Sequence, residues 1–216
     1  MIFRSVRLCA AVVWFACLGA SLSACAPIIL GSVAMGTLVA TDRRTSGAQL
    51  EDEGIELRAA GRVRESLGER ARVSVTSYNR QVLLTGEVSN AQDKQLAEQI
   101  VSRVENVRAI VNELGVLGNS SLTQRSSDAL VTGRVKASMV DAKDLFANSF
   151  KVVTERGTTY LMGRVTQREA NRATDITRST SGVQRVVRVL EIISEEELQR
   201  TLPQTPAPAR ALPPKT

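Results

Sequence analysis

The stretch that decides the fold is LLTGEV at residues 83–88, which recurs as YLMGRV at residues 160–165. Two further pairs of segments repeat in the same order: GRVRESL at 61–67 with GRVKASM at 133–139, and VRAIVNEL at 107–114 with VQRVVRVL at 183–190. The offset between the copies moves from 72 to 77 to 76 residues, which short insertions in loops explain. Such self-similarity indicates one structural unit present twice. We therefore predict domain 1 at residues 50–116 and domain 2 at residues 124–193.

Each copy carries the same order of helix, strand, strand, helix and strand. Apolar residues at every fourth position indicate the first helix of domain 1, and Val131, Val135 and Met139 indicate its counterpart in domain 2. Runs of β-forming residues joined by short polar turns predict a hairpin in each copy. The remaining predicted elements are strands at 73–78, 82–88, 150–154 and 158–165, and helices at about 90–105 and 167–180. The predicted fold class is α+β, with two tandem αββαβ domains, each a small three-stranded sheet with two helices on one face.

The N-terminus has the three parts of a bacterial secretion signal. Two arginines supply positive charge, residues 8–22 are almost wholly apolar, and small residues follow toward a cleavage point. The sequence Leu22-Ser23-Ala24-Cys25 resembles a lipobox, in which the cysteine thiol receives a diacylglyceryl group before the signal is cut off. We predict a lipoprotein signal peptide at residues 1–24 and a lipid anchor on Cys25. The alternative is an ordinary signal peptide followed by an unrelated cysteine.

Cysteine usage agrees with a lipid anchor. Cys9 and Cys17 lie in the predicted signal peptide, so the mature chain keeps Cys25 as its single cysteine. A single cysteine leaves no internal disulfide framework, and multiple acyl chains on one residue give stable anchoring. Position 26 is Ala and not Asp, which by resemblance to sorted lipoproteins favours the outer membrane, with the chain facing the periplasm.

Besides the signal peptide, three segments lie outside the two predicted domains. Residues 25–49 hold the lipidated cysteine and a tether. Within this segment, the apolar residues 26–40 are broken by Gly and Pro, and they form either a flexible tether or a second membrane-contacting segment. Residues 117–123 form a linker between the domains. Residues 194–216 are predicted to be a disordered, Pro-rich tail.

Composition narrows the class of function. The chain contains no histidine, so it has no Ser-His-Asp triad and no His-ligated zinc site, and it contains no Walker loop, GxGxxG or CxxC motif. We predict a protein that is not an enzyme and that holds no cofactor and no metal. The net charge of +6 favours acidic partners, which in the periplasm are anionic phospholipids and not nucleic acid. A solvated surface with surplus arginine would give the same charge.

Charge and apolar placement both point to domain 2 as the lipid-binding copy. Domain 1 has nine Arg and Lys against eleven Asp and Glu, a net charge of −2, whereas domain 2 has twelve against seven, a net charge of +5. A well-placed Lys or Arg near an anionic lipid surface contributes about 1 kcal/mol. Aligning the first helices at the offset of 72 places Leu130 opposite Arg58 of domain 1, so domain 2 has an aliphatic residue where domain 1 has a charge.

The loop that follows the first helix of domain 2 adds an aromatic residue. Phe146, like Leu130, either inserts shallowly into a membrane or is buried, whereas strand alternation places Phe150 in the core. The predicted phospholipid-binding residues are Leu130, Arg134, Lys136, Ala137, Lys143 and Phe146.

The repeated residues resemble the BON domain, an αββαβ module of bacterial envelope proteins. A hydrophobic strand that ends in Gly-x-Val appears at residues 84–88 and 161–165. The last strand begins with Asn106-Val107 in domain 1 and with Gly182-Val183 in domain 2. In this pattern Gly86 and Gly163 are interpreted as structural residues. Over about residues 20–193, the lipobox and two ordered copies resemble the dual-BON outer-membrane lipoproteins.

The resemblance implies a function without catalysis. It implies binding of anionic phospholipid, notably phosphatidylglycerol, through domain 2, together with support of envelope integrity and of the division site. The alternative is a protein-interaction module that docks on an envelope protein partner and regulates outer-membrane assembly or cell-wall amidase activation.

Overall fold

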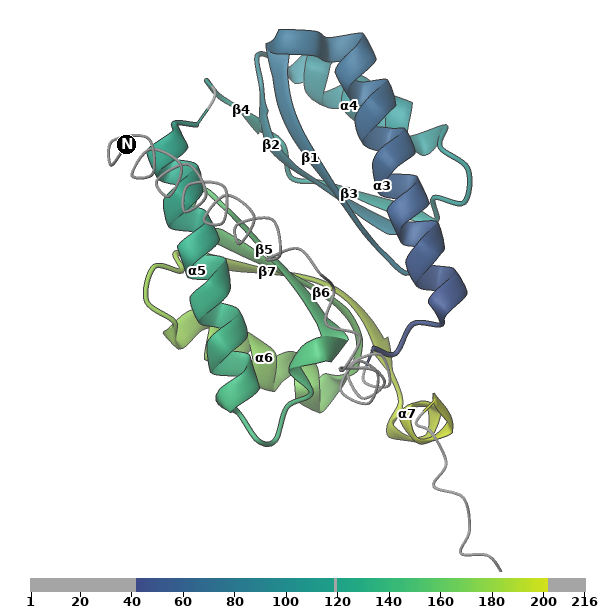
Figure 1. Cartoon of the computed structure of the whole chain (residues 1–216), viewed down its shortest axis with the longest axis vertical. Coiled ribbons are helices and arrows are strands. Elements are labelled where there is room, and N and C mark those ends of the chain that lie inside the picture. The colour runs from purple at the N-terminus through teal and green to yellow at the C-terminus, as the bar shows by residue number, and fades with distance from the viewer. Residues whose placement is uncertain (1–41, 119, 202–216) are drawn as a thin grey trace, which may run out of the picture. The chain divides into compact units, whose positions relative to one another are not determined.

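The structure is a computed structural model that describes residues 42–118 and 120–201 (Figure 1). The predicted signal peptide, Cys25, residues 26–41 of the tether and the tail beyond residue 201 lie outside these ranges. Within them, no helix combines the length and the apolar character needed to cross a bilayer.

Domain 1 is a small mixed sheet with two helices on one of its faces (Figure 1). Strand β1 pairs antiparallel with β2, and β2 pairs in parallel with β3 and with β4. The last strand predicted from the sequence is split into β3 and β4 at Glu113 and Leu114, because Leu114 turns into the core. The elements are α3 (Ser46–Leu67), the 3-10 turn η3 (Gly68–Arg70), β1 (Ala71–Tyr78), β2 (Gln81–Val88), α4 (Ala91–Ser102), β3 (Ala109–Asn112) and β4 (Gly115–Val116).

Domain 2 repeats this architecture with an unbroken last strand. Its sheet has the order β5-β6-β7, antiparallel and then parallel. Helices α5 and α6 lie on one face of that sheet (Figure 1). The elements are α5 (Leu122–Asp141), the 3-10 turn η4 (Ala147–Ser149), β5 (Phe150–Glu155), β6 (Thr158–Thr166), α6 (Gln167–Ser179), β7 (Arg185–Ile193) and α7 (Glu195–Thr201). The predicted α+β fold of two αββαβ domains is confirmed.

A buried carboxylate from the first helix of each domain holds the hairpin turn. Residues 79–80 and residues 156–157 all have positive φ, which is typical of two-residue hairpin turns whose twist matches the flanking strands. Asp52 accepts the two backbone N–H groups of the first turn at 2.7 and 2.8 Å. Asp128 accepts those of the second turn at 2.8 and 3.0 Å. These bonds satisfy the amide groups of the two central turn residues, which have no strand partner.

The same carboxylates fix the alignment of the two first helices. Asp52 corresponds to Asp128, an offset of 76 residues, and the buried stripes of α3 and α5 follow this register. The offset of 72 used in the sequence analysis is therefore wrong by four residues, about one turn of helix. The structural counterpart of Arg58 is Arg134 and not Leu130. A stripe that repeats every four residues superposes on itself after such a slip, which explains the error.

Each domain has its own core between its helices and its sheet, and a third apolar cluster joins the domains. The cores are centred on residues such as Ile55 and Leu84 in domain 1 and Val135 and Leu161 in domain 2. The third cluster consists of Tyr78, Leu83, Tyr160, Met162 and Val189. Its members come from strands of both domains, so the sheet faces that the helices leave open pack on each other.

Ion pairs connect the two domains around this cluster. Among the described residues, five salt bridges cross between them: Glu56–Lys151 (2.6 Å), Arg72–Glu155, Glu87–Arg156 (3.2 Å), Arg108–Glu191 (2.9 Å) and Glu113–Arg185 (2.7 Å). Part of the basic surplus of domain 2 thus faces the acidic surplus of domain 1.

Two glycines lie where a side chain cannot fit. A Cβ atom on Gly163 would lie 2.5 Å from the carbonyl oxygen of Ser149, the last residue of η4 before β5. At Gly86, where φ is +112°, a Cβ atom would lie 2.0 Å from the carbonyl oxygen of Arg72. Both distances are far below van der Waals contact, so the Gly-x-Val motif is structural, as predicted.

The segment after β7 differs from the sequence prediction. Residues 194–216 are expected to be disordered, but α7 occupies Glu195–Thr201. Glu195, Glu196 and Glu197 lie in its first turn, where the helix dipole favours negative charge. Leu198 is buried and Glu197 pairs with Arg164. These tertiary contacts hold a turn of helix that composition alone did not indicate.

Candidate functional site

Helix α5 presents one face to the core of domain 2 and the opposite face to solvent. Ser121 caps its N-terminus by accepting the Gln124 amide at 3.2 Å. Its buried residues are Asp128, Val131, Val135 and Met139, which recur at helical spacing. This packing fixes which side chains point outward.

The outward face of α5 carries an uncharged strip of apolar and small residues. Leu130 is 63% exposed, Val140 is 68% exposed, and Ala137 lies between them on the same face. Leu122, near the start of the helix, is also exposed. Exposure of several aliphatic side chains along one helix face marks a candidate contact surface.

Basic side chains flank this strip. Arg134 follows Leu130 by one helical turn and donates to the carbonyl oxygen of Ser181 at 3.5 Å, while its side chain stays exposed. Lys136 lies on the other flank of the strip and is exposed, as is Lys143 in the loop after the helix. The helix thus combines an apolar surface with cations on its borders.

In the loop between α5 and β5, the structure shows which apolar side chains are buried and which are exposed. Leu145 and Phe150 are buried, each 7% exposed, and belong to the core of domain 2. Phe146 is 53% exposed, so burial does not explain this side chain. The guanidinium of Arg43 lies 6.0 Å from the centre of its ring.

The structure places all six predicted residues on the surface of α5 and the following loop. Leu130, Arg134 and Ala137 share one face of the helix, and Lys143 and Phe146 are exposed in the loop that follows. The sequence analysis missed Val140 and Leu122. Helical spacing would have found both, because Val140 lies three residues after Ala137 and Leu122 lies eight residues before Leu130.

Domain 1 offers a natural comparison, because its helix α3 is the counterpart of α5. Leu50 and Leu57 are 71% and 77% exposed on α3, but Glu53, which lies between them, and Glu65 are exposed as well. Carboxylates oppose contact with an anionic surface, so exposed aliphatic residues alone do not make α3 an equivalent site.

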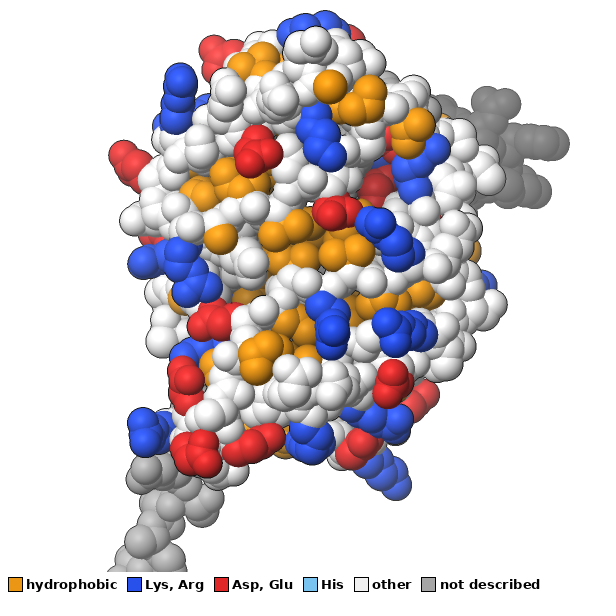
Figure 2. Space-filling model, turned by 180° about the vertical axis from the view of Figure 1, so that it is seen from behind, with side chains coloured by type: hydrophobic (Ala, Val, Ile, Leu, Met, Phe, Trp, Pro, Cys, Tyr) orange, Lys and Arg blue, Asp and Glu red, His pale blue; other side chains and the backbone are white. Residues whose placement is uncertain are grey.

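Figure 2 shows the side opposite to the view of Figure 1, where hydrophobic side chains form a band bordered by both basic and acidic side chains. An apolar surface with cations near it is therefore not unique to α5. No acidic residue lies between Leu130 and Val140 on α5, and the exposed Asp141 follows at the C-terminal end of the helix.

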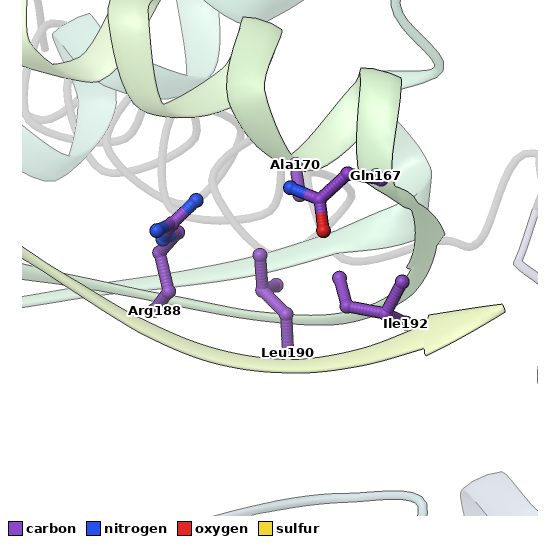
Figure 3. Close-up of a pocket in the computed structure, with 5 residues that line it drawn as sticks. All are labelled: Gln167, Ala170, Arg188, Leu190 and Ile192. Atoms are coloured by element: carbon purple, nitrogen blue, oxygen red, sulfur yellow. The ribbon is translucent and has the colours of Figure 1, made fainter.

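A shallow groove between α6 and β7 offers no acid–base chemistry. It is lined by Gln167, Ala170, Arg188, Leu190 and Ile192 (Figure 3). This set includes no carboxylate, hydroxyl or thiol. Among the residues that the structure describes, no group of three His, Cys, Asp or Glu side chains is arranged to hold a metal ion.

Comparison with known proteins agrees with the repeat seen in the structure. The BON domain family matches residues 56–118 and 127–194. The outer membrane lipoprotein DolP of Haemophilus influenzae is 38% identical over 174 residues, which cover 80% of this chain and 90% of that protein. A 21 kDa hemolysin of Actinobacillus pleuropneumoniae is 30% identical over 154 residues, which cover 70% of this chain and 79% of that protein.

Both domains match one family, and the similarity to DolP of Haemophilus influenzae extends over both of them. The chain therefore belongs to the BON-domain family, as a dual-BON outer membrane lipoprotein of the DolP group.

Proposed function

We propose that this protein binds membranes containing anionic phospholipid, such as phosphatidylglycerol, through the outer face of α5 in domain 2. Cys25 supplies a permanent lipid anchor in the outer membrane, with the chain facing the periplasm. The protein acts without catalysis, supporting envelope integrity and the division site. The observation that carries the proposal is the exposed strip of Leu130, Ala137 and Val140 with its flanking cations.

Physical chemistry favours this surface for lipid contact. An amphipathic helix binds a membrane interface by burying apolar side chains in the headgroup region while its cations attract anionic lipids. Arg134, Lys136 and Lys143 contribute about 1 kcal/mol each when they lie near such a surface. Phe146 and Val140 extend the apolar contact beyond Leu130. Salt weakens the electrostatic part, because the Debye length is only about 8 Å at physiological ionic strength.

Charge reversal on α5 tests the proposal. The variant with Arg134→Glu and Lys136→Glu should lose at least about 2 kcal/mol of affinity, roughly 30-fold, for vesicles that contain phosphatidylglycerol. The measurement is co-flotation of the non-lipidated Cys25→Ser chain with vesicles of phosphatidylglycerol and phosphatidylcholine. The matched control reverses Arg58 and Arg64 on α3, which are also exposed, and should bind as the parent does.

A protein-interaction module is the competing function. It predicts that binding to vesicles is weak, independent of the headgroup and unchanged in the α5 variant. It also predicts that crosslinking in the envelope recovers a stoichiometric protein partner. Unchanged flotation of the charge-reversed chain would therefore reject lipid binding through α5 in favour of this alternative.

A further inference from the structure

Two consecutive arginines just before α3 reach two different domains. Residues 42–45 connect the N-terminal segment to α3, whose N-cap is Thr45. Arg43 contacts domain 2, and Arg44 contacts domain 1. We call residues 42–45 the clasp, because this short stretch touches both domains at the point where the N-terminal segment meets them.

Arg43 makes a buried, two-pronged ion pair with Glu169 at the start of α6. Its guanidinium nitrogens lie 2.6 and 2.8 Å from the two carboxylate oxygens, and one of them also donates to the carbonyl oxygen of Arg164 at 3.1 Å. The Arg43 side chain is 5% exposed and that of Glu169 is fully buried. Removing one partner of a buried pair leaves an uncompensated charge, so this contact strongly favours one position of the backbone.

Arg44 is held on domain 1 by different chemistry. Its guanidinium lies 2.8 Å from a carboxylate oxygen of Asp52 and stacks over the ring of Tyr78, 4.3 Å from the ring centre. Asp42 pairs with the same guanidinium at 2.8 Å. Asp52 is itself fixed by the hairpin turn of domain 1, so Arg44 docks on a rigid site.

The clasp fixes where the N-terminal segment leaves the folded domains. Through Arg43 this point lies at Phe146, in the loop that follows α5. Asp42 lies seventeen positions after Cys25 in the chain, a span of at most about 60 Å when fully extended. The clasp therefore sets the centre of the region that a lipid on Cys25 can reach, and this region is centred near the end of α5.

We propose that the clasp holds the start of the lipid-bearing tether near Phe146, at the end of α5, so that the anchor and the helix face can contact the same membrane. The orienting role rests on the proposed function of α5, whereas the clasp itself does not depend on lipid. When two contacts belong to one molecule, the second occurs at an effective concentration set by the geometry of the link. Arg43 and Arg44 are thus positioning residues for membrane contact.

Distances between spin labels test the clasp in the mature, lipidated chain in detergent, where acylation blocks the only native thiol. Nitroxides on Thr41→Cys and Asp175→Cys measure the distance between the tether and domain 2. Nitroxides on Gln99→Cys and Asp175→Cys measure the distance between domain 1 and domain 2. We expect Arg43→Ala at least to double the width of the first distance distribution and to leave the second unchanged. Arg43→Lys keeps the charge but not the paired geometry, and should give an intermediate width.

Arg62→Ala removes the same charge from an exposed site on α3 and should change neither distribution. Two results would overturn the clasp: an unchanged first distribution in Arg43→Ala, or an equal broadening of both, which would make Arg43 a domain-packing residue. Circular dichroism establishes that each variant is folded.

A second readout separates the clasp from the proposed function. In nanodiscs with phosphatidylglycerol, a nitroxide on Val140→Cys should be protected by lipid, and Arg43→Ala should reduce the protected fraction at least threefold. Protection that is unchanged by Arg43→Ala overturns the orienting role. Absence of protection in the parent chain contradicts lipid contact by α5, and the label distances still decide whether the clasp exists.

Discussion

Lys151 on β5 donates to Glu56 on α3, with its Nζ atom 2.6 Å from a carboxylate oxygen that also accepts the Ser77 amide at 2.7 Å. This contact joins the first helix of domain 1 to the first strand of domain 2. It belongs to a rim of ion pairs around the apolar cluster between the sheets. The two domains are therefore complementary in charge as well as in shape at this interface, although their folds are copies.

Replacing Lys151 by Met should lower the free energy of unfolding by about 1 kcal/mol. The side chains of the pair are 36% and 28% exposed, so water screens the lost attraction, and the methionine keeps the apolar stem. Urea unfolding measures the change. Lys94→Met on α4 removes a lysine from the helix face of domain 1, and we expect less than half the effect. Equal effects of the two variants would mean that the ion pair does not stabilise the interface.

Stability should fall in acid, because several buried carboxylates are held charged. Burial alone would raise the pKa of Glu87, but hydrogen bonds from Arg72 and Arg156 lower it below its ordinary value of 4.5. Burial also opposes the charged form of Glu169, and Arg43 with the Thr166 amide lowers its pKa overall. A depressed carboxylate contributes stability that is present above pH 4.5 and is lost as the pH falls through the folded-state pKa.

Glu155 acts in the opposite sense, because burial and the neighbouring Glu87 and Asp128 raise its pKa despite the attraction of Arg72. The contribution of Glu155 to stability therefore increases as the pH falls. This gain is outweighed, because four other carboxylates have lowered pKa values: Asp52, Glu87, Glu169 and Glu191. We expect urea unfolding to show a nearly constant free energy from pH 7 to 5 and a steep decrease below pH 4.5. Glu87→Gln should flatten the decrease, and equal stability of the parent at pH 3 and pH 7 would contradict this account.

Gly163→Ala should destabilise domain 2 by about 2–3 kcal/mol, since the new methyl group must displace the backbone of Ser149, which directly precedes β5. Gly61→Ala is the matched control. Nothing lies within 4 Å of a Cβ atom at Gly61, which is in the interior of α3, so this change should raise stability by up to about 1 kcal/mol. Thermal unfolding followed by circular dichroism measures both, and opposite signs are the expected result.

Leu130→Asp should weaken binding to phosphatidylglycerol vesicles at least tenfold, because it places a charge in the apolar strip of α5 and repels the lipid headgroups. Leu57→Asp introduces the same change at an exposed position on α3 and should leave binding within twofold of the parent. Both sites are exposed, so neither substitution should unfold the protein. Equal losses in the two variants would show that membrane contact is not specific to domain 2.

The fold was predictable because local patterns define its parts. The Gly-x-Val strands, the four-residue stripe and the turn residues each specify one element, and their repetition specifies two domains. The register of the first helix was not predictable from those patterns. The GRV match between residues 61–63 and 133–135 conceals a slip of one turn, and the hairpin contacts of Asp52 and Asp128 reveal it.

Exposure on α5 was only partly predictable. Composition places cations at Arg134 and Lys136, but the sequence could not separate exposed Phe146 from buried Leu145, because both lie in one loop. The partners of Arg43 and Lys151 are 126 and 95 residues away in the chain. Contacts of this kind depend on how two finished domains pack, and no local pattern encodes them.

The central claim is that domain 2 binds anionic lipid through α5, and an NMR titration of the non-lipidated Cys25→Ser chain tests it most directly. Micelles of phosphatidylglycerol should shift amide resonances of residues 122–150 and leave α3 unchanged, and phosphatidylcholine micelles should shift neither. Equal shifts with both lipids, or no shifts with either, would contradict the claim and leave the lipid on Cys25 as the sole membrane contact.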